Sequence, residues 1–224
     1  MKANLAPSVS LDFLDGYLFR LLQEIVADCG AEKSGFFDYY SSRVKGKIGG
    51  LMEYEERLTR YLVANYSNCR VVHAGTGIGT LPCALACNGM AVTAIESLRS
   101  RVESARRIRA AIVDIWPEID PRYDIIAGVY PEALDSGRCG PDSILVFTNV
   151  ASDWSVEQET SIIQSMQDFG QAVLDLRLFG HVRNEEVDRA KLFTRIAATA
   201  RSAERLPDVG VHVDAHFARF EFAQ

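Results

Sequence analysis

Apolar residues follow a helical period in the first part of the chain and gather into short runs after about residue 69. In two early segments, 11–26 and 53–66, apolar residues recur three and four positions apart, and this spacing predicts two amphipathic helices. The stretch 38–50 between them is rich in Tyr, Ser, Lys and Gly and predicts a loop. We therefore expect residues 1–66 to form an N-terminal helical cap that packs on a second unit, residues 67–224.

From residue 69 onward, short apolar runs alternate with helical patterns. Strands are predicted at 70–74, 91–96, 123–128, 143–149, 171–177, 209–214 and 216–222, and helices near 80–88, 98–114, 156–168 and 184–203. Strands that alternate with helices form a mainly parallel sheet covered on both faces. The last two runs are almost adjacent, and strands so close can join only as an antiparallel pair. The predicted fold class is α/β, with a mainly parallel seven-stranded sheet that ends in an antiparallel strand.

A glycine-rich turn follows the first predicted strand, with Gly75, Gly77 and Gly79 at alternate positions, and Glu96 ends the second strand. Glycines in this pattern let the backbone turn sharply and let a ligand lie against the main chain. An acid at the end of the second strand can accept both hydroxyls of a ribose. The dinucleotide fingerprint needs a glycine where this chain has Thr80. The pattern favours a nucleoside-type ligand over a turn that needs glycine for packing alone.

This turn, with an acid 17 residues after its third glycine, resembles motif I and the second-strand acid of class I S-adenosylmethionine-dependent methyltransferases. The terminal antiparallel pair agrees with that family. The resemblance covers 70–224 and is strongest up to the acid. It implies a Rossmann-like fold, S-adenosylmethionine as cofactor, and methyl transfer to a small-molecule acceptor. It places donor contacts at His73, Gly75, Thr76, Gly77, Gly79, Glu96, Val129, Tyr130 and Asn149.

Two positions depart from the family's usual pattern, and Asn149 occupies the position of its fourth motif. His73 stands where an acid normally contacts the amino end of the donor, and a histidine bonded to its surroundings is the alternative reading. No acid follows Gly128 after the third strand, so Val129 or Tyr130 would form an apolar wall for the adenine. Asn149 ends the fourth strand where donor and acceptor meet in the family, and it is a candidate to orient the acceptor.

Further candidate chemistry lies in two other segments. His181 follows the fifth strand, and we interpret it as the general base because an unperturbed histidine titrates near pH ~6.5. The 38–50 loop is a candidate lid, whose Arg43 or Lys45 would bind the donor carboxylate, and a solvated basic loop is the alternative reading. His212 and His216 fall within the last two predicted strands and are read as structural.

Composition narrows the class of protein. A net charge of −6 over 224 residues argues against a nucleic-acid partner. No apolar stretch reaches the length of a membrane span, and the first twenty residues lack the pattern of a signal peptide. Five scattered cysteines fit a reducing compartment, so we expect a cytoplasmic protein. Cys83 and Cys87 are read as core residues, with no metal site, because no further ligand lies near them in sequence.

Two further functions stay open at this point. One is transfer of another group of the same donor, of the aminocarboxypropyl type, and the other is a non-catalytic nucleoside-binding protein. A dinucleotide oxidoreductase is disfavoured by Thr80. Methyl transfer would be a direct displacement at the sulfonium methyl, which needs positioning more than a nucleophile or metal. The acceptor atom and the oligomeric state, monomer or homodimer, are not determined by the sequence.

Overall fold

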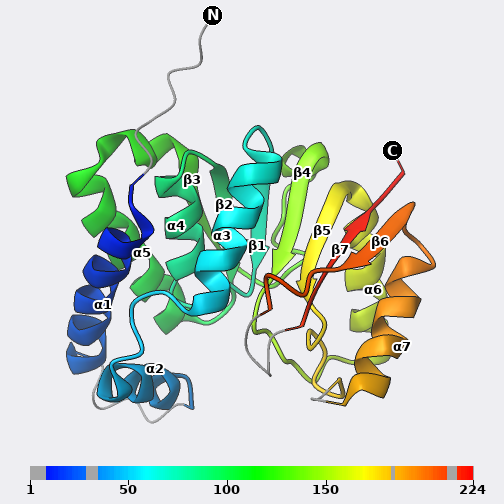
Figure 1. Ribbon diagram of the computed structural model, residues 1–224, viewed down its shortest axis with the longest axis horizontal. Helices are drawn as coiled ribbons and strands as arrows, with labels where there is room; N and C mark the ends of the chain where they lie inside the picture. Colours follow the sequence, from blue (N-terminus) through cyan, green and yellow to red (C-terminus); the bar gives the residue numbers. More distant parts are fainter. Residues whose placement is uncertain (1–8, 29–34, 183–184, 211–215, 224) are drawn as a thin grey trace, which may run out of the picture.

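A single seven-stranded sheet forms the centre of the protein (Figure 1). The computed structural model describes residues 9–28, 35–182, 185–210 and 216–223. The strand order is β3-β2-β1-β4-β5-β7-β6, in which β7 is antiparallel to both of its neighbours and the other pairs are parallel. The predicted α/β fold class, with its terminal antiparallel strand, is confirmed.

Except for β6, the strands begin and end close to where the apolar runs predict. Their bounds are β1 Arg70–Ala74, β2 Ala91–Glu96, β3 Tyr123–Ala127, β4 Gly140–Phe147, β5 Phe169–Asp175, β6 Ser202–Arg205 and β7 Phe217–Glu221. Successive side chains of a strand point to opposite faces. Val71 of β1 therefore packs in the core on one face of the sheet, and Val72 packs in the core on the other. Both residues are fully buried.

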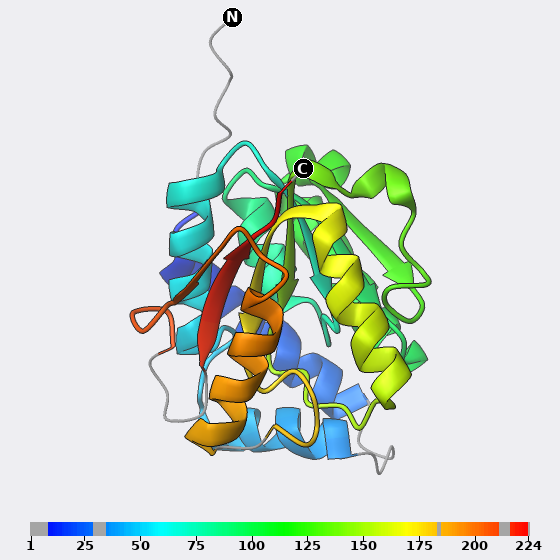
Figure 2. The same ribbon diagram turned by 90° about the vertical axis from the view of Figure 1, so that its right-hand side faces the viewer.

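Helices cover both faces of the sheet, and Figure 2 shows the two that cover the second face, α6 and α7. Those of the first face are α1 Leu11–Asp28, α3 Glu53–Tyr66, α4 Thr80–Cys87 and α5 Arg99–Ile115, and those of the second are α6 Val156–Ser165 and α7 Glu186–Ala197. Helix α2, Gly35–Gly46, packs beside α1. Short 3₁₀ turns are formed by Pro117–Arg122, Ser136–Arg138 and Met166–Asp168. None of the described helices is both long and apolar enough to cross a membrane.

Three predicted elements differ from the structure, and two of these differences have a tertiary cause. The predicted loop 38–50 contains most of α2, a helix that forms where Tyr40 enters the core shared with α1. The predicted helix 184–203 ends at Ala197, and residues 202–205 instead form β6 at the edge of the sheet. Their composition favours a helix, but the ladder with β7 overrides it. The predicted strand 209–214 is a turn at 209, and 211–214 lie outside the described residues.

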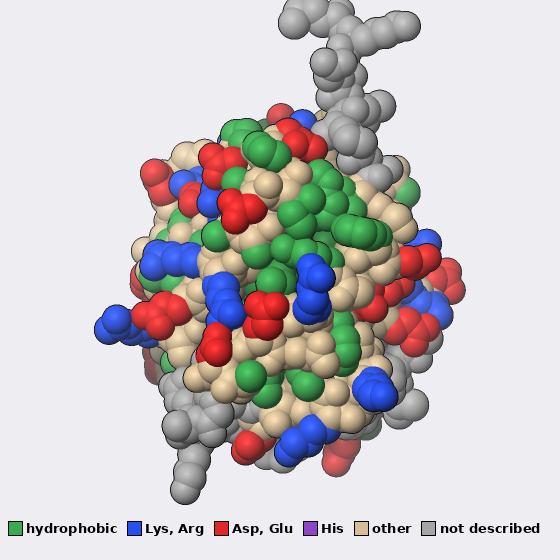
Figure 3. Space-filling view, turned by 90° about the vertical axis from the view of Figure 1, so that its left-hand side faces the viewer, with side chains coloured by type: hydrophobic (Ala, Val, Ile, Leu, Met, Phe, Trp, Pro, Cys, Tyr) green, Lys and Arg blue, Asp and Glu red, His purple; other side chains and the backbone are tan. Residues whose placement is uncertain are grey.

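The N-terminal helices share one hydrophobic core with the sheet. Leu18 of α1 and Leu58 of α3 are fully buried in the cluster that also holds Val71. On the face over α1 and α5, apolar side chains lie among interleaved acidic and basic groups in the part of the surface that is described (Figure 3). Phe13, which is 57% exposed there, rests edge-on against Trp116, with ring centroids 5.8 Å apart. The helices thus pack directly on the sheet.

Candidate functional site

The candidate site lies at the carboxyl ends of β1, β2 and β4. Strand order reverses at β1, because β2 continues on one side of it and β4 on the other. Ligands of open α/β sheets bind at such a switch point. Two cavities open there, of about 420 Å³ and about 240 Å³. Gly75, Arg101 and Asn149 line both cavities, so the two are adjacent.

The three glycines of the turn between β1 and α4 all need a positive φ, at 68° for Gly75, 62° for Gly77 and 81° for Gly79. A Cβ on Gly79 would lie 2.3 Å from the Tyr123 hydroxyl, so this glycine lets α4 pack against β3. A Cβ on Gly77 would lie 3.1 Å from the Tyr40 hydroxyl, at the cavity wall. Gly75 and Gly77 therefore line the site, whereas Gly79 is a packing glycine outside both cavities.

Glu96 ends β2 with its carboxylate buried at the wall of the larger cavity. Its Oε2 accepts a hydrogen bond from the Gly77 amide at 2.8 Å, and its Oε1 accepts from the amides of Ser97 and Leu98 at 2.9 and 3.0 Å. The Arg101 guanidinium lies 4.0 Å from Oε2. Carboxylate oxygens have about four lone-pair sites, so one remains for a ligand hydroxyl. The carboxylate thus couples the glycine turn to the cavity.

Apolar side chains give the larger cavity its other wall. Leu98 is 49% exposed and Val129 is 51% exposed, and both line this cavity. Tyr130 also lines it, but the ring is buried, packs edge-on against Phe147 with centroids 5.3 Å apart, and shares a hydrogen bond of 2.7 Å with Ser165. Two exposed apolar side chains beside the buried Glu96 carboxylate are suited to pack against a flat nucleobase.

His73 is buried between two threonine hydroxyls. Its Nε2 lies 2.9 Å from Thr148 Oγ1, and its Nδ1 lies 3.1 Å from Thr76 Oγ1. Burial lowers the pKa of His73 to about 3, so the ring is neutral near pH 7. Thr76 and Thr148 line the smaller cavity, and the imidazole itself stands behind them. His73 therefore brings no charge to the cavity and orients the two threonines.

The smaller cavity is roofed by the N-terminal helices. Arg43 and two tyrosines come from α2, and Glu55 and a third tyrosine come from α3. The three phenols are those of Tyr39, Tyr40 and Tyr54, and burial raises the pKa of each. The phenols are thus neutral at physiological pH. The charged groups that α2 and α3 bring to this cavity are the guanidinium and the carboxyl group.

Arg43 is only 2% exposed, and backbone carbonyls fix it. Its Nη2 donates to the carbonyls of Gly49 and Gly50, both at 3.0 Å. The loop that carries these carbonyls is tied to α1, because the Leu51 amide donates to Asp15 Oδ1 at 2.7 Å. The Nε atom of Arg43 is buried without a hydrogen-bond partner. A buried donor with no acceptor is unfavourable, so the site is suited to receive an anionic group.

Glu55 is 6% exposed and joins the first turns of two helices. Its Oε2 accepts from the Met52 amide at 2.7 Å, which caps α3, and its Oε1 accepts from the Thr80 hydroxyl of α4 at 2.7 Å. Burial raises the pKa of Glu55, and the nearby positive charge of Arg43 opposes that effect. Each carboxyl oxygen keeps one acceptor position for a ligand.

The structure brings most of the sequence-predicted residues to these two cavities, but not all of them. Asn149 lines both cavities and has a φ of 51°, a left-handed conformation that asparagine tolerates better than most residues. His181 does not join them: its ring is largely exposed, and its Nδ1 lies 2.8 Å from Glu159 of α6. That position gives no support to a role as general base. Lys45 is exposed outside both cavities.

His216, Cys83 and Cys87 line neither cavity. His212 lies outside the described residues. His216 lies just before β7, and its amide is 3.5 Å from the carboxylate of Asp175. Cys83 and Cys87 are buried in the core. Among the described residues, no three His, Cys, Asp or Glu side chains converge as metal ligands.

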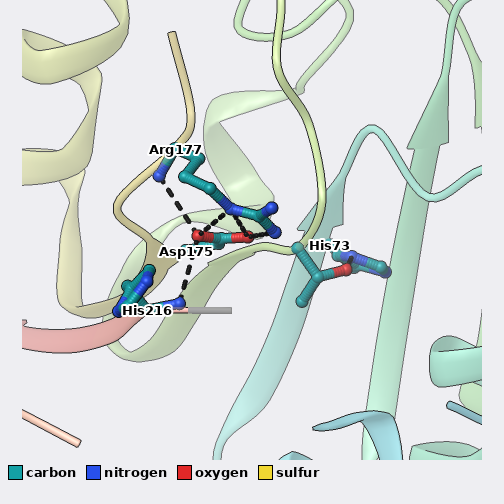
Figure 4. Close-up of polar contacts among 5 residues, drawn as sticks. His73, Asp175, Arg177 and His216 are labelled. Atoms are coloured by element: carbon teal, nitrogen blue, oxygen red, sulfur yellow. Dashed lines mark hydrogen bonds and ion pairs between the residues drawn. The ribbon is translucent and has the colours of Figure 1, made fainter. Parts of the chain in front are cut away.

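A buried ion pair closes the neighbouring end of β5. Asp175 is 2% exposed and accepts from Arg177 Nη2 at 2.7 Å and from its Nε at 3.2 Å. Figure 4 shows this pair with His216 beside it and His73 across from it. The pair lies at the same carboxyl edge of the sheet as the two cavities, because β5 is parallel to β4. It holds the chain that leaves β5 in place.

Sequence reasoning missed Leu98 and Glu55. Leu98 is an apolar residue two positions after the acid of β2, at the start of the helix predicted near 98–114. Glu55 lies on the same helical face as Leu58 and Leu62, both fully buried. A single acid on an apolar stripe is a signal that could have marked it, because buried carboxylates need partners.

No protein-family model matches the chain, and no curated protein does. Solved structures do match. The methyltransferase domain of bacterial CtHen1-C is 11% identical with a TM-score of 0.58, over 77% of this chain and 98% of that one. The magnesium protoporphyrin IX methyltransferase ChlM from Synechocystis PCC 6803, solved with bound S-adenosylmethionine, is 15% identical with a TM-score of 0.55, over 100% of both chains. This chain therefore has the Rossmann-like fold of class I S-adenosylmethionine-dependent methyltransferases.

Proposed function

We propose that this protein binds S-adenosylmethionine and transfers its methyl group to a small-molecule acceptor. The observation that carries the proposal is the buried carboxylate of Glu96, held by the Gly77 amide at the wall of a cavity that also exposes Leu98 and Val129. In this arrangement the remaining acceptor position of the carboxylate takes a ribose hydroxyl, and the two apolar side chains flank the adenine. Bound S-adenosylmethionine in the structurally similar ChlM is consistent with it.

The smaller cavity would then take the rest of the donor and the acceptor. The larger cavity is of a size for a nucleoside, since ligand pockets typically measure about 300–1,000 Å³. The amino-acid end of the donor would continue past Gly75 into the smaller cavity, where Arg43 provides an unused donor for its carboxylate. The sulfonium would lie near Asn149, which lines both cavities.

Methyl transfer to an acceptor would be an in-line displacement, in which the acceptor atom forms a bond to the methyl carbon as the bond to sulfur breaks. The sulfonium leaves as a neutral thioether, so the protein needs mainly to position the two reactants. Asn149 would orient the acceptor through its side-chain amide. The roof of α2 and α3 over the smaller cavity favours an acceptor of modest size.

The experiment is ligand binding followed by product analysis. S-adenosylhomocysteine should raise the melting temperature, because a ligand that binds only the folded state stabilises it by mass action. No shift at millimolar S-adenosylhomocysteine, together with a clear shift by a nicotinamide dinucleotide, would overturn donor binding. With acceptor mixtures, S-adenosylhomocysteine as product marks methyl transfer, whereas methylthioadenosine marks transfer of the aminocarboxypropyl group. Binding without any turnover across a broad acceptor panel would favour a non-catalytic nucleoside-binding protein.

A further inference from the structure

Strand β1 carries no acidic residue that could bind the ammonium group of the donor. The strand instead carries His73, which is neutral and has both ring nitrogens within hydrogen-bond distance of threonine hydroxyls. A donor that carries an α-amino group nevertheless presents a positive charge in this region. An unpaired charge against a buried cavity wall is unfavourable. Some other carboxylate must therefore lie within reach if the amino-acid end binds here.

Glu55 of α3 is the carboxylate on the wall of the same cavity. It lines the smaller cavity together with Thr76 and Thr148, the two threonines that His73 orients. Its two oxygens are fixed by the Met52 amide and the Thr80 hydroxyl, so the group is preorganised and does not swing in solvent. A cation beside the carboxylate would also offset the effect of burial on its charged form.

Arg43 supplies the opposite charge from α2. Its Nε is buried and unpartnered, and its Nη2 is fixed by the carbonyls of Gly49 and Gly50. The guanidinium also lies over the rings of Tyr39 and Tyr40, at 5.8 and 5.6 Å from their centroids. A cavity with one fixed cation and one fixed carboxylate matches an α-amino acid, which carries both charges on one carbon.

We propose that Glu55 and Arg43 together bind the zwitterionic end of the donor. In this arrangement Glu55 binds the ammonium group, for which strand β1 provides no carboxylate. This inference rests on the proposed function, because it assumes an adenosine-type donor in the adjoining cavity. It assigns discrimination between donors with and without an amino-acid end to α2 and α3, which lie outside the glycine turn. Glu55 acts as a binding residue and not only as a helix cap.

The test compares two ligands on one substitution. S-adenosylhomocysteine carries the amino-acid end, whereas 5′-methylthioadenosine keeps the nucleoside and lacks that end. Glu55→Gln removes the charge but keeps a residue type that caps helices at the same position. We expect calorimetric titration to give a 10- to 100-fold weaker affinity for S-adenosylhomocysteine, the range for loss of a charge-assisted hydrogen bond, and an unchanged affinity for 5′-methylthioadenosine.

The matched control is Glu56→Gln, which makes the same charge change one residue later on α3. Glu56 pairs with Arg60 at 3.5 Å and lines neither cavity. We expect both affinities to be unchanged in this variant. Arg43→Lys, which keeps the charge but moves the donor atom, should weaken S-adenosylhomocysteine alone.

The outcomes separate this inference from the proposed function. If Glu55→Gln weakens both ligands equally, or neither, the zwitterion assignment is wrong and Glu55 is a cap of α3. If the wild-type protein binds neither ligand, the proposed donor itself is wrong. If Glu55→Gln does not fold, titration of the wild-type protein decides instead: S-adenosylhomocysteine should bind at least 10-fold more tightly than its deaminated analogue, and equal affinities would overturn the assignment.

Discussion

Buried, neutral His73 should make the protein lose stability as the pH falls below 6.5. Its pKa moves from 6.5 in the unfolded chain to about 3 in the folded protein, because burial disfavours the charged ring. Between these values the unfolded state binds the proton and the folded state does not. The stabilisation is therefore complete above the unfolded pKa and is lost progressively as the pH falls toward the folded one.

The magnitude follows from proton linkage. With the two pKa values above, His73 removes about 2 kcal/mol from the unfolding free energy between pH 7 and pH 5, and about 4 kcal/mol by pH 3. The first figure is set mainly by the unfolded-state pKa, since the buried ring is still neutral at pH 5. It is a measurable part of the roughly 5–15 kcal/mol that stabilises a typical domain.

Urea unfolding at pH 7 and pH 5 measures the effect, with His73→Gln as the reference. The glutamine has no titratable group, while the other histidines and Glu55, whose raised pKa acts in the opposite direction, remain in both proteins. The wild-type protein should lose about 2 kcal/mol more than the variant over this interval. Equal losses of unfolding free energy in the two proteins would show that the His73 ring is not buried in its neutral form. Should the variant fail to fold, the ring resonances of wild-type His73 must show a neutral imidazole at pH 5, and a protonated one would refute the reasoning equally.

Three substitutions test the larger cavity and the glycine turn. Glu96→Ala should weaken S-adenosylhomocysteine binding by about one to two decades, because a charge-assisted hydrogen bond from a ribose hydroxyl to this carboxylate contributes about 1.5–3 kcal/mol. A folded variant with unchanged affinity by calorimetry would remove Glu96 from the ribose. Gly77→Val should abolish donor binding and lower the free energy of unfolding, measured by a denaturant melt, by about 1–3 kcal/mol. The φ of Gly77 is 62°, and a side chain there would approach Tyr40. A folded variant with normal affinity would show that the turn serves packing only. Leu98→Ser should weaken the binding of 5′-methylthioadenosine about tenfold with little change in melting temperature. The Leu98 side chain is 49% exposed and contributes mainly to the cavity wall. An unchanged affinity would show that the base binds elsewhere.

Local pattern determined the sheet and the turn. The strands of 70–74 and 91–96 and the helix of 53–66 were predicted at the bounds that the structure has, because buried β-branched runs and a helical apolar stripe depend on residue period alone. The glycine turn and the position of Glu96 at the end of a strand were also predicted from the sequence, since a sharp turn after a strand needs residues that accept a positive φ. The fold class followed from the alternation of these elements.

Tertiary contacts decided the rest. Helix α2 and strand β6 form against their local composition, because α2 buries Tyr40 beside α1 and β6 completes a ladder with β7. No local pattern predicts that the His181 ring contacts the Glu159 carboxylate, or that His73 lies between two threonines that are distant from each other in sequence.

The roof of the smaller cavity depended on the tertiary structure most of all. Arg43 and Glu55 are 12 residues apart on different helices, and of the two only Arg43 was a candidate from the sequence. They line one cavity because the loop between their helices is tied to Asp15 of α1 and because Glu55 bonds Thr80 of α4. Sequence period fixes which face of a helix is apolar, but only the packing of four helices at one sheet edge brings these two opposite charges to the same wall.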